Sequence, residues 1–165
     1  MATNDKIMLG YGTVTVGGTA IGLTRGGSVF AVEREYREIS ADGDYGYNLG
    51  RIVIDREVAK LTVNALELFT AANMAKYYPG TELTTGVSED TWKSTLEIVA
   101  GDHNDIVWTG KTLDGKSVVI QLDDAINLGN LEWSLEDKNE VVPSIEFTAV
   151  YSDQDTAPWS VKFGK

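Results

Sequence analysis

The chain of 165 residues contains no cysteine, few prolines and no long apolar run. The lack of cysteine excludes disulfides and thiolate metal sites, and 3 prolines leave little room for rigid linkers. No segment approaches the roughly 20 apolar residues of a membrane-spanning helix, and residues 1–12 hold no apolar run of signal-peptide length. We therefore expect a protein without a membrane partner that stays in the cytosol until it is assembled into something larger.

Motifs for catalysis and cofactor binding are also missing. The sequence has no GxGxxG, GxxxxGK(S/T) or GxSxG pattern, which are common signatures of dinucleotide, phosphate and nucleophile sites. The single histidine, His103, lies in a turn sequence without a recognisable serine or cysteine nucleophile. Asp42, Asp44 and Asn48 are oxygen donors, but their spacing does not fit a calcium-binding loop. We predict a protein that is not an enzyme and has no cofactor and no metal site.

Acidic residues outnumber basic ones. The 25 Asp and Glu against 14 Lys and Arg give a formal net charge of −11. Because affinity for nucleic acid depends on lysine and arginine neutralising phosphates, this charge argues against a protein that holds DNA or RNA. Two interpretations stay open: an acidic surface that keeps the protein soluble, and an acidic surface past which DNA slides.

Apolar residues recur mostly with period two, the pattern of half-buried β-strands. Gly17-Gly18 and Asp114-Gly115 are good two-residue hairpin turns between such strands. The strand patterns cover residues 11–16, 19–23, 28–39, 51–68, 94–99, 105–113, 116–122, 131–135 and 145–151. We therefore predict a mainly β protein, an antiparallel β-sandwich or barrel, in one domain of residues 1–165.

Three segments depart from the strand pattern. Residues 70–78 predict one short α-helix, because Thr70 is a plausible N-cap, alanines follow it and Pro79-Gly80 ends it. Residues 82–91 are polar, and we expect a loop. Residues 152–165 are also polar, and we expect a C-terminal tail with a Pro158-Trp159 anchor.

A long β-hairpin is the most informative element for function. Its loop, about residues 36–56, contains SADGDYGYNLG at 40–50, which is rich in turn formers. Loops of this length in a compact domain are usually functional or disordered, and Tyr45 and Tyr47 favour contact over disorder. Basic residues alternate with glutamates on this hairpin, and we expect them to form ion pairs with a neighbouring strand or subunit: Arg34, Arg37, Arg51, Arg56 and Lys60.

Several segments, taken in their order and spacing, are similar to one known family. They are IGLTRGG at 21–27, EREYREI at 33–39 with ADG at 41–43, KLTVNALEL at 60–68, LEDKNE at 135–140, FTA at 147–149 and PW at 158–159. Each alone is an ordinary strand or turn, but together they resemble the major tail tube proteins of long-tailed bacteriophages. The resemblance covers most of the chain and is weakest over residues 82–100.

The resemblance implies a tail tube fold, related to the tubes of contractile tails and type VI secretion, whose copies assemble into stacked hexameric rings. It implies a virion protein of the tail, assembled in the host cytoplasm, whose lumen conducts double-stranded DNA without binding it specifically. Its partners would be itself, the tape measure protein, the tail terminator and the baseplate or distal tail proteins. The long hairpin loop would reach a neighbouring ring through Asp42, Asp44, Tyr45, Tyr47, Asn48 and Arg51.

The acidic lumen face is a separate hypothesis from the strand pattern. We expect residues 131–135 and 145–151 to pair around a charged turn, with their apolar side chains inward. Glu132, Glu136 and Glu146 then share the outer face. If this face lines the lumen, DNA phosphates meet like charge and do not adhere to it.

A second function stays open, a monomeric β-sandwich that acts as a binding or adhesion module. Tryptophan side chains could stack on sugars in such a module; they are Trp92, Trp108, Trp133 and Trp159. Trp133 fits a core position better, and the others are spread too widely to define a platform. Size separates the two functions, since a tube subunit forms oligomers and a module stays a monomer.

Overall fold

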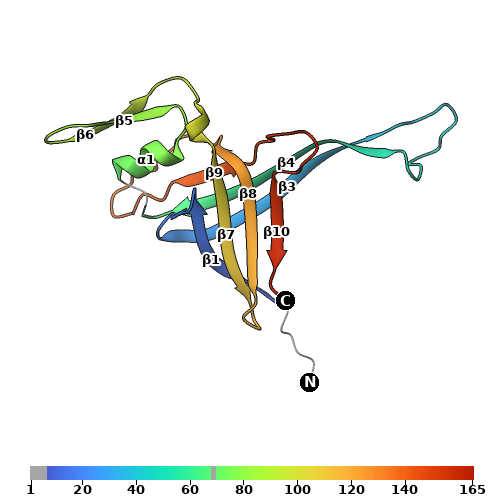
Figure 1. The fold of residues 1–165 in the computed structure, drawn as a ribbon, viewed down its shortest axis with the longest axis horizontal. Coiled ribbons are helices and arrows are strands. Elements are labelled where there is room, and N and C mark those ends of the chain that lie inside the picture. Colours follow the sequence, from blue (N-terminus) through green and yellow to red (C-terminus); the bar gives the residue numbers. More distant parts are fainter. Residues whose placement is uncertain (1–6, 68–69) are drawn as a thin grey trace.

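The computed structural model describes residues 7–67 and 70–165. In this part of the chain, α1 (Ala71–Tyr77) is the single α-helix, η1 (Ala100–Asp102) is a 3-10 turn, and the strands pair antiparallel. The strands are β1 (Met8–Val16), β2 (Thr19–Ala20), β3 (Thr24–Glu38), β4 (Ile52–Ala65), β5 (Thr81–Thr85), β6 (Asp90–Ser94), β7 (Asn104–Thr112), β8 (Ser117–Asn127), β9 (Ser144–Thr148) and β10 (Trp159–Phe163). The prediction of a mainly β antiparallel protein with one short helix is confirmed (Figure 1).

The long strand β8 joins two groups of strands. The sheet runs in the order β2-β1-β7-β8-β9-β4-β3, with β10 added on β8. Residues 118–122 of β8 pair with β10, and residues 126–127 pair with β9. Between these two segments Asp124 has a positive φ of 48°, so the strand bends where it changes partner. Figure 1 shows β1, β7, β8 and β10 crossing the direction of β4 and β3.

Alternating side chains of both groups fill the core. On β4 the side chains of Leu61, Val63 and Ala65 are buried, as are those of Ile145, Phe147 and Ala149 on and after β9. β7 and β8 contribute the remaining centre of the core: Ile106, Trp108, Val118, Ile120 and Leu122. The period of two in the sequence therefore reports burial on one face of each strand.

The short helix begins and ends as predicted. Thr70 Oγ1 accepts a hydrogen bond from Asn73 N at 3.3 Å, which caps the helix, and α1 ends at Tyr77, two residues before Pro79. Met74 and Tyr77 are buried against the core. Tyr77 O accepts a hydrogen bond at 3.0 Å from Asn127 Nδ2 of β8. The helix is thus fixed to the point where β8 ends.

The predicted strand at residues 131–135 is wrong. These residues form no strand, and Leu131 and Leu135 are exposed, while Trp133 alone of the three packs against the core. The predicted partner, β9, pairs with β4 along one edge. On its other edge Phe147 and Thr148 pair with β8, and Glu146 O accepts from Leu128 N. Residues 131–135 do not pair with β9, although the alternation of their sequence suits a strand.

Four further predictions are corrected. The segment 82–91 belongs to the β5–β6 hairpin, where threonines favour strands and Glu82 lies 3.0 Å from Lys93. A strand over 94–99 does not form, because Leu96 adopts a positive φ of 60°. The tail 152–165 contains β10, whose five residues pair with β8. The predicted strand 51–68 ends at Ala65 in β4, and its last residue, Leu68, lies outside the described residues.

Candidate functional site

The hairpin of β3 and β4 extends beyond the body of the protein. The two strands pair as far as Glu38 and Ile52, and Asp55 is an extra residue in β4 between the pairs made by Arg56 and Ile54. Such a β-bulge bends the strand and increases its twist. We call residues 36–54, beyond the bulge, the arm. Figure 1 shows the arm reaching away from all other strands.

The turn of the arm is shorter than predicted. The strands leave only residues 39–51 unpaired at the end of the arm, rather than about 36–56, and we call residues 39–51 the arm loop. Asp44 Oδ2 accepts from Ala41 N at 2.7 Å and lies 2.9 Å from Arg51 Nη1. Glu38 Oε1 accepts from Asn48 N at 3.0 Å. These bonds fold the arm loop within the single chain, so less conformational entropy is lost when it binds.

The arm exposes large apolar side chains. Tyr45 and Leu49 in the arm loop are fully exposed, at 108% and 105%, and Tyr47 is exposed at 83%. Further exposed apolar side chains lie along the arm: Tyr36, Ile39, Ile52 and Ile54. Monomeric soluble proteins rarely leave extended apolar patches in water, and such patches mark contact sites. The predicted loop residues are therefore brought together at a surface suited to contact.

The polar residues of the predicted loop set hold its shape. Asp44, Asn48 and Arg51 are engaged in the bonds just described, whereas Asp42 is exposed. Among the described residues no group of three or more His, Asp or Glu side chains is placed to hold a metal ion. Asp44 and Arg51 thus hold the shape of the loop, while Tyr45, Tyr47 and Leu49 are exposed to solvent.

The predicted ion pairs form within the hairpin. The five basic side chains pair with carboxylates of the same hairpin: Arg34 with Glu57, Arg37 with Asp55 (3.0 Å), Arg51 with Asp44 (2.9 Å), Arg56 with Glu35 (3.8 Å) and Lys60 with Glu33 (3.3 Å). The pairs of Arg37 and Arg56 are exposed on both sides, and such pairs contribute little to stability. The pairs neutralise charge along the hairpin.

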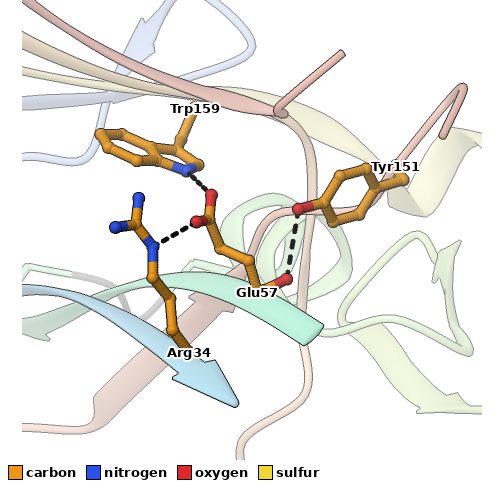
Figure 2. A network of polar contacts seen from close by, with 4 residues as sticks. All are labelled: Arg34, Glu57, Tyr151 and Trp159. Carbon is orange, nitrogen blue, oxygen red and sulfur yellow. Dashed lines mark hydrogen bonds and ion pairs between the residues drawn. The ribbon is translucent and has the colours of Figure 1, made fainter. Parts of the chain in front are cut away.

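A polar network lies where the hairpin leaves the core. The inward positions along the hairpin are Phe30, Val32 and Arg34 on β3, opposite Leu61, Ala59 and Glu57 on β4. The inner face therefore changes from apolar to charged at the Arg34 and Glu57 pair. Figure 2 shows Arg34, Tyr151 and Trp159 converging on Glu57.

Glu57 joins three parts of the chain at this point. Its Oε1 accepts from Trp159 Nε1 of β10 at 2.6 Å, its Oε2 accepts from Arg34 Nε, and its backbone O accepts from Tyr151 Oη at 3.3 Å. The Trp159 ring also packs on Phe30, with ring centroids 5.9 Å apart. These contacts fix the direction in which the hairpin leaves the body. No sequence pattern predicts this network, although the alternation of Trp159, Val161 and Phe163 is a usable signal for a strand.

The network lowers the pKa of Glu57. The hydrogen bond from Trp159 is the largest cause, and the hydrogen bond and charge of Arg34 act in the same direction, against burial, which raises the pKa. A carboxylate whose pKa is lower in the folded than in the unfolded state stabilises the fold above its unfolded pKa. That stabilisation is lost as the pH falls through the folded value.

We expect the Glu57→Gln variant to be less sensitive to acid than the wild type. The wild-type melting temperature should fall as the pH drops below about 4.3, the ordinary glutamate value, while the variant loses this contribution at every pH. Thermal unfolding at pH 7 and pH 3 measures the difference. Glu35→Gln is the control, because its ion pair with Arg56 is exposed on both sides. Equal acid sensitivity of the Glu57→Gln variant and the wild type would contradict the role of this network.

The predicted acidic residues are brought together only in part. Glu132 and Glu146 line one hollow of about 400 Å³, with Thr62, Asn130 and Ser144. Glu146 also lies 3.8 Å from Lys60. Glu136 is not part of this hollow and bonds locally, accepting from Ser134 Oγ at 3.2 Å and Asn139 Nδ2 at 3.0 Å. The face is therefore smaller than predicted and does not come from paired strands.

The four tryptophans pack in or against the core. Trp108 is buried, and Trp92, Trp133 and Trp159 are partly buried. Trp92 stacks on Trp133 with ring centroids 6.2 Å apart. The Trp92 ring also packs on the Tyr78 ring, with centroids 5.7 Å apart. This pair fastens the β5–β6 hairpin to the body. The arrangement favours a structural role for the tryptophans over a sugar-stacking platform.

No protein-family model and no curated protein sequence matches the chain. In the described ranges, no helix has both the length and the apolar character needed to cross a membrane. The functional conclusion therefore depends on the geometry of this chain.

Proposed function

We propose that this protein is the subunit of a self-assembling tube, the tail tube of a long-tailed bacteriophage. In this proposal its copies form hexameric rings that stack in the virion tail, after assembly in the host cytoplasm. The tape measure protein, the tail terminator and the baseplate or distal tail proteins are its further partners. The role is structural rather than enzymatic, and DNA passes through the lumen without specific binding.

The observation that carries this proposal is the arm with its prefolded apolar loop. A loop that holds its own shape and exposes Tyr45, Tyr47 and Leu49 in water is suited to bind a surface on another molecule. The arm reaches beyond the body (Figure 1), so the partner surface lies on a neighbouring molecule. Repetition of such a contact between copies builds a ring or a filament.

Open strand edges support the same function. Among the described strands β3 pairs only with β4, and β2 covers only Thr15 and Val16 of β1. Long open edges promote pairing with another chain unless they are blunted. Edges at both ends of one sheet suit a subunit whose sheet continues into its neighbours.

Sedimentation velocity over a wide concentration range tests the proposal. A tube subunit is expected to form species far larger than the 17.9 kDa chain as the concentration rises. A single species of the chain mass at every concentration would instead favour the monomeric binding or adhesion module.

We place the hollow of Glu132 and Glu146 on the lumen side. The Glu132→Lys/Glu146→Lys variant is then expected to assemble normally and to impair DNA delivery, because lysines in the lumen attract phosphates. Electron microscopy of tails and the titre of infectious particles measure the two effects. Glu136→Lys, outside the hollow, is the matched control. Loss of assembly in the double variant would place the hollow at an interface between subunits instead. An unchanged titre would show that the hollow does not line the lumen.

A further inference from the structure

A second apolar surface lies at the ends of the strands of the body. A pocket of about 500 Å³ is lined there by residues from β1, β7, β8 and β10 and from the turn and tail beside them: Met8, Thr112, Asp114, Lys116, Ser117, Val118, Phe163, Gly164 and Lys165. We call it the strand-end pocket. Met8 and Phe163 are exposed there, as is Leu113 in the adjoining turn. The strand-end pocket is thus a hollow with apolar walls whose lining also carries Asp114, Lys116 and Lys165.

We propose that the strand-end pocket receives the arm loop of a second copy of this chain. This inference rests on the proposed function and names the partner surface of the arm. Figure 1 places the arm loop and the strand ends at separate extremities of the molecule, so the contact joins two copies. It is heterologous, since each copy offers one loop and one pocket, and it can repeat from copy to copy.

The sizes of the two surfaces agree. A cavity of about 150 Å³ takes a benzene ring, so about 500 Å³ takes the Tyr45 ring together with the Leu49 side chain. The loop presents these two side chains fully exposed. Burying them against Met8 and Phe163 removes apolar surface from water on both partners.

The charges of the two surfaces are complementary. Two lysines, Lys116 and Lys165, line the strand-end pocket together with one carboxylate, Asp114, so its lining has an excess of positive charge although the chain carries a net charge of −11. The arm loop carries Asp42, which is exposed, while the charge of Asp44 is matched by Arg51. An acidic aromatic loop therefore meets a basic apolar pocket. Such complementarity favours this pairing over contact with the acidic parts of the surface.

The other apolar hollow of the body fits the loop less well. It is lined by Leu66, Trp133, Leu135 and Val141, and its two charged residues, Arg25 and Glu140, pair with each other at 2.9 Å. That pair leaves no excess positive charge for the acidic loop. The strand-end pocket is therefore the better receptor.

Disulfide trapping tests this assignment, because the chain has no cysteine of its own. Under mild oxidation the Gly46→Cys/Ser117→Cys variant is expected to form a ladder of covalent multimers, because Gly46 lies in the arm loop with open space for a Cβ and Ser117 lines the pocket. Both substitutions leave Tyr45, Leu49 and Phe163 in place. The Gly46→Cys/Val87→Cys variant is the control, since Val87 is fully exposed but lies on the turn of the β5–β6 hairpin. Wild-type protein is imaged in parallel to establish that it assembles.

Each outcome decides between the two proposals. A ladder from the 46/117 pair and none from the 46/87 pair supports the pocket. Wild-type tubes with no ladder from the 46/117 pair, or with equal ladders from both pairs, overturn the pocket and leave the tube function standing. A wild-type chain that stays monomeric and forms no ladder overturns both.

A charge exchange gives a second readout that does not depend on cysteine chemistry. Lys116→Glu is expected to raise the concentration needed for assembly by about two- to fivefold at low salt, the effect of one exposed ion pair. Adding Asp42→Lys to the same chain should restore assembly. If Asp42→Lys does not restore the assembly that Lys116→Glu weakens, Asp42 does not contact this pocket.

Discussion

A subunit in which Tyr45 and Leu49 are both replaced by serine is expected to fold normally and to stay monomeric where the wild-type chain assembles. Both side chains are fully exposed in the single chain, so their removal leaves the core intact. Burying two such side chains contributes about 3–6 kcal/mol at about 1.5–3 kcal/mol each. The concentration needed for assembly should therefore rise by at least about 100-fold.

Light scattering against concentration measures this shift, and circular dichroism checks that the fold is kept. Val87→Ser is the matched control, because Val87 is as exposed as Leu49 but lies on the other hairpin. Deletion of residues 42–48 should likewise leave a folded subunit that makes no long tubes. Normal assembly of the Tyr45→Ser/Leu49→Ser variant would show that the arm loop does not mediate the contact between copies.

The Leu61→Ala variant is expected to lose about 2–5 kcal/mol of the free energy of unfolding. Leu61 is 1% exposed and lies between Phe30 of β3 and Phe147 of β9, so alanine leaves a cavity at the centre of the core. Because small domains have only about 5–15 kcal/mol in total, this is a large part of the stability. Urea unfolding should show a lower midpoint with an unchanged slope.

Val29→Ala is the control for this substitution. Val29 lies on β3 opposite Thr62, one residue away from the Phe30 and Leu61 pair, and is exposed on the other face of the sheet. The control should change the free energy of unfolding by no more than about 0.5 kcal/mol. Similar losses in the two variants would contradict the assignment of the inner face.

The strands that the sequence predicts correctly are those with one buried face. β4 and β9 alternate clearly because one side meets the core and the other meets water. The alternation at residues 131–135 is as clear, yet no strand forms there. β9 pairs instead with β4 along one edge and with the end of β8 at residues 147–148 of the other. Occupancy of an edge depends on distant parts of the chain and leaves no mark in a local pattern.

Some parts of the candidate site could be predicted from the sequence and others could not. Loop length, turn formers and two tyrosines suffice to single out the arm loop. The network at Glu57 is beyond local patterns, because its hydrogen bond to Trp159 joins residues 102 positions apart. The strand-end pocket combines the ends of β1, β7, β8 and β10, and only the folded chain brings those ends together. Glu132 and Glu146 do meet, although they do so without the strand pairing that led to the prediction.

Negative-stain electron microscopy of the purified full chain, at low and high concentration, shows whether the protein assembles into a tube. We expect rings with a central hole at low concentration and hollow tubes at high concentration, both lost in the Tyr45→Ser/Leu49→Ser variant. Small particles of uniform size at every concentration, with the wild type and the variant alike, would contradict it.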